Sequence, residues 1–474
     1  MTASSPSNAQ PDVRAIDASA RGPLLCLVGS AILWLVVGGV LALIASIQLH
    51  TPGFLNDCAF FTYGRMQAAQ ETVFVYGWTI NAGLAIGLWL LARLGGAPLR
   101  GAGLALVGAI FWNLALTVGV AGILAGDLTG IVFLQLPAYV QPLMLVAYAA
   151  VAAAGVLAWT GRRKAFTFAT QWYAVAALFI FPWAFSVAQV TLLFAPVHGT
   201  LQAVVASWFG QNLSALVLAP FALAAAYYLL PKISGRPIHH YDYAGHAFWV
   251  LIVIGGWAGG RHLIGGPVPA WVSTTGIIAS VLLLFHYLVV AVNLGGVFSL
   301  RGSVAVRFVA VGVLAYLLGG ALNAATSIRG VAQFTQFTFV SVAQTQLLLG
   351  GAFAFIFFGA LYFLVPRLAG KPWPSAVLIR VHFAVGLTGL ALKVGGLFAA
   401  GWIQGADLNR ASTDFATIAA HLQMGLFTAT AGQALLLLGS VAMAFNFGWL
   451  LLALARQSAA EFLQPPSAQE VPAS

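Results

Sequence analysis

Twelve stretches of about 20 apolar residues, almost free of charged side chains, constrain the fold of this chain more than any other feature. Each stretch is long enough to cross the hydrocarbon core of a bilayer as a helix. Of the 474 residues, 61% are hydrophobic and only 6% are charged, which is typical of a polytopic membrane protein. Because backbone polar groups inside a bilayer must find their partners within the protein, we expect every stretch to be helical.

The sequence therefore predicts an all-α integral membrane protein with twelve transmembrane helices. We expect one membrane domain over residues 25–456, between tails 1–24 and 457–474 whose Ala, Ser, Pro and Gln content is typical of disorder. The predicted spans are 25–48, 71–92, 102–125, 135–158, 170–194, 211–230, 246–266, 271–295, 305–325, 339–365, 376–402 and 425–454.

The basic residues predict the orientation of these spans. Fifteen of the 20 Lys and Arg residues lie in or beside the two tails or the even-numbered loops. By the positive-inside rule, this places both termini in the cytoplasm of a multi-pass protein in the bacterial cytoplasmic membrane. The same bias accounts for the net charge of +10, and no basic stripe interleaved with aromatic residues indicates a nucleic-acid partner. Cys26 and Cys58 lie at opposite ends of the first span, too far apart for a disulfide.

The tenth span opens with polar side chains that cannot titrate. Gln336, Gln344 and Gln346 precede a long apolar run that ends near Leu368. Residues two apart in a helix point roughly 200° away from each other. Gln344 and Gln346 are therefore expected to face different neighbours on opposite sides of the helix.

Two sites carry ionisable residues near the outer ends of spans. Asp57, Arg65 and Glu71 follow the first span, and we interpret them as an interfacial loop with an ion pair. Arg261 and His262 end the seventh span, where an interfacial anchor is favoured over a metal site, because a single His with no second ligand does not hold a transition metal.

Two further ionisable residues lie inside spans. Lys393 is close to the middle of the eleventh span, and the sequence shows no acid within a span core to pair with it. It is therefore expected to be neutral or to face a wet cavity or a partner helix. His286, in the eighth span, is either a functional residue or a neutral histidine hydrogen-bonded across a helix interface.

Short motifs in order along nearly the whole chain make it resemble the catalytic subunit of cbb3-type cytochrome c oxidases, in the haem-copper oxidase superfamily. The resemblance implies that family's twelve-helix bundle. It rests on Gly64-Arg65, Trp208-Phe209-Gly210, Tyr227-Tyr228, Pro231-Lys232, Trp257-Ala258-Gly259, Ser327-Ile328-Arg329, Phe358-Gly359-Ala360-Leu361-Tyr362, Val365-Pro366, His382-Phe383, Gln404-Gly405 and Met443-Ala444-Phe445-Asn446.

The resemblance also implies two b-type haems and one copper held by six histidines, and this chain lacks five of those six. The family's ligand positions fall on Gln70 and Gln346 for the low-spin haem, Gln344 for the high-spin haem, and Gln211, Arg261 and His262 for copper. A carboxamide is a poor ligand for haem iron and copper, because its nitrogen lone pair is delocalised and its oxygen is hard. We expect no cofactor, a degenerate active site, and glutamines that form a hydrogen-bonded polar network instead.

Three functions follow as hypotheses. The first is a cofactor-free relative of the oxidase subunit, serving as a structural or accessory component of a respiratory complex beside other membrane subunits, among them membrane-anchored cytochrome c subunits. The second is an active oxidase or nitric oxide reductase with unusual ligands. The third is a transporter or channel that uses the emptied haem cavities, with Lys393, His286 and Arg261 on its path.

Overall fold

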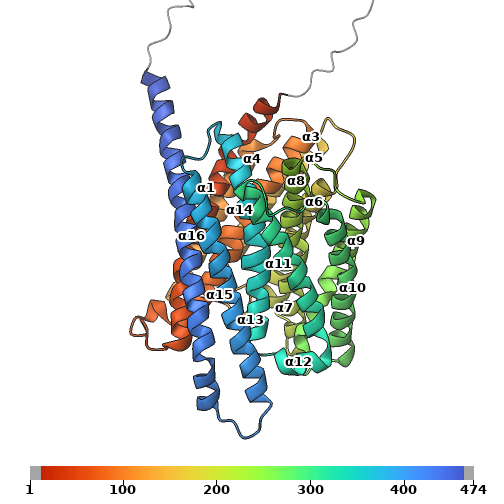
Figure 1. Ribbon diagram of the computed structural model, residues 1–474, viewed down its shortest axis with the longest axis vertical. Coiled ribbons are helices and arrows are strands. Elements are labelled where there is room, and N and C mark those ends of the chain that lie inside the picture. Colours follow the sequence, from red (N-terminus) through yellow and green to blue (C-terminus); the bar gives the residue numbers. More distant parts are fainter. Residues whose placement is uncertain (1–11, 464–474) are drawn as a thin grey trace, which may run out of the picture.

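The computed structural model describes residues 12–463, and the all-α membrane fold is confirmed. Within those residues, eleven helical segments are long and apolar enough to cross a membrane. The remaining predicted span, the seventh at 246–266, is the short helix α9 continued by the 3₁₀ helix η6, whose sequence contains four glycines that disfavour an α-helix. Figure 1 shows these helices side by side in one bundle.

The long elements follow the predicted spans closely. Their bounds are α1 (Val13–His50), α2 (Tyr63–Thr72), η2 (Val73–Ile80), α3 (Asn81–Gly95), α4 (Ala102–Ala125), α5 (Gln141–Thr160), α6 (Ala169–Gln189), η3 (Val190–Phe194), α7 (Thr200–Asn212), η4 (Leu213–Leu218), α8 (Ala219–Ser234), α9 (Ala244–Ile254), η6 (Gly255–Leu263), α10 (Ala270–Gly295), α11 (Val304–Ser327), α12 (Arg329–Thr335), α13 (Phe339–Gln346), η7 (Leu347–Phe353), α14 (Ala354–Ala369), α15 (Ala376–Leu408) and α16 (Phe415–Leu463).

Both predicted tails are shorter than the sequence indicated. Residues 13–24 are helical and belong to α1, because Ile16, Ala20 and Leu24 are buried in the bundle. Asp17 fixes this part of the helix to α3, since it accepts a hydrogen bond from Trp89 Nε1 at 3.0 Å. At the other end, α16 continues to Leu463, and the predicted tail residues 1–11 and 464–474 lie outside the described residues. The two described ends lie at the same end of the bundle (Figure 1).

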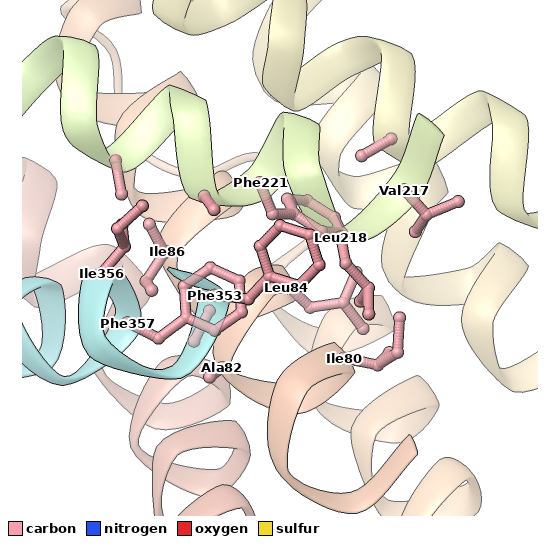
Figure 2. Packing of buried hydrophobic residues seen from close by; sticks show 14 of the residues in the cluster. Ile80, Ala82, Leu84, Ile86, Val217, Leu218, Phe221, Phe353, Ile356 and Phe357 are labelled. Carbon is pink, nitrogen blue, oxygen red and sulfur yellow. The ribbon is translucent and has the colours of Figure 1, made fainter. Parts of the chain in front are cut away.

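Three helical segments form the centre of the bundle. Tyr63–Gly95, Thr200–Ser234 and Phe339–Ala369 are the most buried of the membrane-length segments. Figure 2 shows apolar side chains from all three meeting in one core, among them Leu84, Phe221 and Phe357. Each segment begins at the end of the bundle opposite to the described termini, so polar residues in its first turns lie in that half of the molecule (Figure 1).

Candidate functional site

A narrow cavity separates the central helices from α15 and α16. Its volume is about 60 Å³, enough for a few water molecules. Gln70 from α2 and Gln346 from α13 both line it, so the structure brings together the two residues that the resemblance pairs across the low-spin haem. Within residues 12–463, neither of these two side chains forms a hydrogen bond that would join it to the predicted polar network.

Lys393 lines the same narrow cavity from α15. Its Nζ donates a hydrogen bond to Gln433 Oε1 at 2.7 Å, and Gln433 Nε2 donates to the Gly39 carbonyl at 3.3 Å. The lysine therefore faces the neighbouring helix α16 and the cavity rather than lying alone in the membrane. No Asp or Glu in the described part of the chain pairs with it within salt-bridge distance.

Glu71 corrects the predicted outer loop. It lies inside α2, lines the narrow cavity, and accepts hydrogen bonds from Gln67 Nε2 at 2.6 Å and Gln135 Nε2 at 2.7 Å. Arg65 instead donates to the carbonyls of Ala59 and Leu124, so the ion pair expected in this region is absent from the described residues. An acid does therefore lie within a membrane-length helix, contrary to the sequence interpretation of Lys393.

A much wider cavity, of about 1010 Å³, opens on the other side of the central helices. The other four residues that the resemblance places at ligand positions all line it: Gln211, Arg261, His262 and Gln344. Gln344 and Gln346 thus point into different surroundings, as their spacing predicts, although Gln346 also reaches the wide cavity. Glu71 lines both cavities as well, so the two are neighbours.

Arg261 is brought into the wide cavity by close packing of η6 between α7 and α10. A Cβ added to Gly259 would lie 2.7 Å from the Ser207 carbonyl oxygen, and one added to Gly276 would lie 2.5 Å from the carbonyl carbon of Gly260. Only glycine allows backbones to approach so closely. The interfacial anchor expected for Arg261 is wrong, because the residue is only 8% exposed and its Nη2 donates to Asn323 Oδ1 at 2.7 Å.

Two glutamines of the wide cavity, Gln211 and Gln344, are hydrogen-bonded, as expected of a polar network, and so is Gln336 beside it. Gln344 Nε2 donates to Thr326 Oγ1 at 2.7 Å and to the Leu322 carbonyl at 3.2 Å. Gln211 Nε2 donates to the Gly255 carbonyl at 3.0 Å, and Gln336 Nε2 donates to the His262 carbonyl at 2.7 Å. These bonds join the helix ends around the cavity. Gln70 and Gln346, which line the narrow cavity, take no part in these bonds.

His286 is fully buried between helices, in the arrangement that the sequence left as one of two alternatives. Its Nδ1 lies 2.7 Å from the Ala247 carbonyl oxygen, and because a carbonyl can only accept, Nδ1 carries a proton. Its Nε2 is 2.9 Å from the Tyr316 hydroxyl, which lines the wide cavity. His286 itself does not line the wide cavity, and its hydrogen bond to Tyr316 is what links it to the cavity wall.

His382 is a cavity residue that the sequence analysis names only within a motif of the resemblance and not as a candidate site residue. It is 2% exposed, lines the narrow cavity from α15, and its Nδ1 lies 2.7 Å from the Tyr362 hydroxyl. Its place inside an apolar span was the available signal, since intramembrane histidines are functional candidates by default.

Each central helix also changes its winding directly after a ligand position. The π-helical segments η2, η4 and η7 begin at Val73, Leu213 and Leu347, within three residues of Gln70, Gln211 and Gln346 respectively. A π-helical turn adds a residue to the helix and is frequent at functional sites. Hydrophobic periodicity gave no indication of these segments.

The fold and its two cavities, each with polar side chains in its wall, define an integral membrane protein built around internal sites. A model of the family described as "Cytochrome C and Quinol oxidase polypeptide I" matches residues 23–455, and the chain belongs to this family. The resemblance drawn from the sequence is confirmed by this match. Members of the family carry haem and copper and work in multi-subunit respiratory complexes.

Individual relatives agree with this family. The chain is 24% identical over 462 residues to the "Cytochrome c oxidase subunit 1 homolog" of Agrobacterium tumefaciens (strain T37), covering 93% of this chain and 85% of the relative. It is 24% identical over 446 residues to the "Cbb3-type cytochrome c oxidase subunit CcoN1" of Stutzerimonas stutzeri, covering 88% and 91%. A solved "heme-copper terminal oxidase dimer" has the same fold, with a TM-score of 0.71 at 14% identity, over 98% of this chain and 86% of that one.

The side chains at the two cavities do not fit the family's cofactors. At the positions that the resemblance assigns to ligands, the narrow cavity offers the carboxamides of Gln70 and Gln346, and the wide cavity offers two more carboxamides, a guanidinium and the imidazole of His262. Among the described residues that line each cavity, the narrow one has a single imidazole, that of His382, and the wide one has only that of His262. Haem iron and copper in this family need imidazole nitrogen, and a guanidinium has no lone pair to donate. Within the described residues, no three His, Cys, Asp or Glu side chains gather as a metal site.

Proposed function

We propose that this protein is a cofactor-free homologue of the cbb3-type oxidase catalytic subunit and serves as a structural or accessory subunit of a respiratory complex. The observation that carries the proposal is the chemistry at the two cavities, where carboxamides and a guanidinium occupy five of the family's six ligand positions. A permanently cationic Arg261 would also repel a copper ion at that place.

The retained fold supports an accessory role. The bundle keeps the family's length and helix order, so the outer surfaces that would contact other subunits can persist after the ligands are lost. The partners we propose are other membrane subunits of a respiratory complex, among them membrane-anchored cytochrome c subunits. The location is the bacterial cytoplasmic membrane, and cytoplasmic placement of both termini stays a prediction of the positive-inside rule.

Haem content tests the loss of cofactors. The chain would be purified alone in detergent and examined for a Soret band, by a pyridine haemochrome assay, and for iron and copper by elemental analysis. We expect no Soret band and no stoichiometric metal, because no cavity offers an axial pair of imidazoles. A content of about two haems per chain would contradict the proposal and would favour an active oxidase or nitric oxide reductase.

Copurification tests the accessory role. A tagged chain isolated in a mild detergent from its native membrane is expected to bring other respiratory membrane subunits with it, and any haem in the preparation should remain with those partners when they are separated. A chain that emerges alone under conditions that keep known respiratory complexes intact would count against the accessory role.

A transporter remains the second candidate, because the two cavities adjoin. Glu71 and Gln346 line both of them, and Lys393 lines the narrow one, so charged and polar groups follow one another through the bundle. Solute flux into liposomes that contain the purified chain, lost on Lys393→Leu, would favour this function over the accessory one.

A further inference from the structure

Arg261 is a buried positive charge that lacks a negative partner in the described chain. The guanidinium carries five N–H donors, and within residues 12–463 it donates one hydrogen bond, to the neutral amide of Asn323. No Asp or Glu lies within salt-bridge distance of it among those residues. A buried charge without an ionic partner is costly, so its persistence in a cavity indicates that an external anion completes the site.

The wide cavity has the shape of a ligand site rather than of a packing defect. At about 1010 Å³ it matches the upper end of the range, ~300–1,000 Å³, typical of pockets for small organic ligands, and it far exceeds the space that an inorganic anion fills. It runs inward from exposed rim residues, Gly199 and Gln202, to the buried Arg261. A long ligand could therefore enter from the rim and place one end against the guanidinium.

The walls of this cavity are divided between two kinds of surface. Polar groups stand near Arg261, where Gln211 packs against η6 and Tyr287 adjoins the guanidinium. The rest of the wall is largely apolar and includes Leu192, Leu193, Leu251, Leu348, Leu349 and Phe353. A ligand that satisfies both surfaces has one anionic head and an apolar tail.

Among the described residues that line the cavity, Glu71 is the one acid, and its position is compatible with an anionic ligand. Both of its carboxylate oxygens already accept hydrogen bonds, from Gln67 and Gln135. It does not pair with Arg261, so the two charges occupy separate parts of the wall. The ligand's head would approach the guanidinium and leave Glu71 beside the neutral amides.

We propose that the wide cavity binds a single-chain amphiphile with a carboxylate head, whose carboxylate is held by Arg261 and whose alkyl chain lies along the leucines. A carboxylate is the best match, because the planar guanidinium fork donates two parallel hydrogen bonds to its two oxygens. This binding site does not depend on the accessory role proposed above and would exist equally in a transporter.

The test uses laurate as the carboxylate probe on the purified full-length chain in a neutral maltoside detergent. Binding is measured by native mass spectrometry and by the concentration dependence of thermal stabilisation, with dodecanol and dodecyl phosphate as comparison ligands. We expect laurate to bind and stabilise the protein, dodecanol to bind at least about tenfold more weakly because it lacks the charge, and dodecyl phosphate to bind less well than laurate.

Variants assign the binding to the guanidinium. Arg261→Gln should weaken laurate binding about tenfold or more, and Arg261→Lys, which keeps the charge without the fork, should weaken it less. Arg329→Gln is the matched control, because Arg329 is an exposed arginine that does not line the cavity and whose guanidinium, within residues 12–463, donates only to Thr274 Oγ1. Thermal unfolding without ligand shows whether each variant is folded, and Arg261→Lys carries the test if Arg261→Gln is not.

Three binding results would overturn the proposal. The first is equal affinity for laurate and dodecanol. The second is a folded Arg261→Lys or Arg261→Gln protein that binds laurate with the affinity of the wild type. The third is a clear preference for dodecyl phosphate over laurate, which would make the ligand a phosphate-bearing lipid. Haem found in the cavity of the isolated chain would overturn it too, and its Soret band distinguishes that failure from the others.

Discussion

Replacing Gly276 with alanine should expose how tightly η6 is held against α10. The added Cβ would lie 2.5 Å from the carbonyl carbon of Gly260 and closer still to the backbone nitrogen of Arg261. Such contacts are roughly 1 Å or more inside the optimal separation of ~3.5–4.0 Å between non-bonded atoms. Both neighbours are backbone atoms, so no change of side-chain rotamer can relieve the overlap, and η6 itself must move.

The expected cost is about 3 kcal/mol, at the upper end of the ~1–3 kcal/mol typical of overpacked sites. Unfolding would be followed by intrinsic tryptophan fluorescence, which the 14 tryptophans make strong, during titration of mixed micelles with a denaturing detergent. A loss of 3 kcal/mol corresponds to a fall of roughly 150-fold in the ratio of folded to unfolded protein.

Gly295→Ala is the matched control, because Gly295 ends the same helix and an added Cβ would meet nothing within 4 Å. Helix propensity alone favours alanine over glycine by up to ~1 kcal/mol, so this control should be neutral or slightly stabilised. The two substitutions are identical in chemistry and are expected to act with opposite sign. Equal stability of the Gly276→Ala and Gly295→Ala proteins would refute the close contact between η6 and α10, and with it the placement of Arg261.

Two further predictions concern buried charges and use the same unfolding assay. Gln433→Leu should destabilise the protein by about 1–3 kcal/mol, because it leaves the Lys393 ammonium without its hydrogen-bond acceptor, and adding Lys393→Met should recover that loss by removing the charge. If Gln433→Leu is as stable as the wild type, the ammonium does not depend on this amide. Asp17→Ala should lower the free energy of unfolding by about 2 kcal/mol, since it removes the carboxylate that both Arg93 and the Trp89 N–H contact. Asp57→Ala is the control and should have no effect, because Asp57 is exposed. Similar stabilities for the two variants would contradict the contact between α1 and α3.

The membrane fold could be predicted from the sequence because few backbone conformations are stable inside a bilayer. A run of about 20 apolar residues can satisfy its backbone only as a helix, and this rule located most spans to within a few residues. The helix α4 coincides with its predicted range of 102–125. The errors lie at the ends, where residues 13–24 were assigned to a polar tail, because their amphipathic contacts with α3 are tertiary and leave no continuous apolar run.

The order of short motifs also predicts where the family's ligand positions fall in this sequence, and the residues it selects line the two cavities. The role of those residues could not be predicted from the sequence, because the function of a polar side chain in a membrane depends on the groups that it faces. Arg261 at a span end has the pattern of a surface anchor, and only the packing of η6 between α7 and α10 turns it into a buried cavity charge. The sequence around Glu71 predicts an acid in an outer loop. In the structure Glu71 lies within the helix α2, and its carboxylate accepts hydrogen bonds from the amides of Gln67 and Gln135 inside the bundle.

The sequence by itself determined that the chain is a helical membrane bundle related to the oxidases, and through the resemblance it predicts that five of the six ligand imidazoles are missing. Local composition is sufficient for these conclusions, since apolar length and residue identity are properties of the chain alone. Only the tertiary structure decided that these positions are distributed over a narrow and a wide cavity, with Gln70 on the first, Arg261 on the second and Gln346 on both. Cavities form between helices that are far apart in the chain, so their shape and charge arise from packing, which no local pattern encodes.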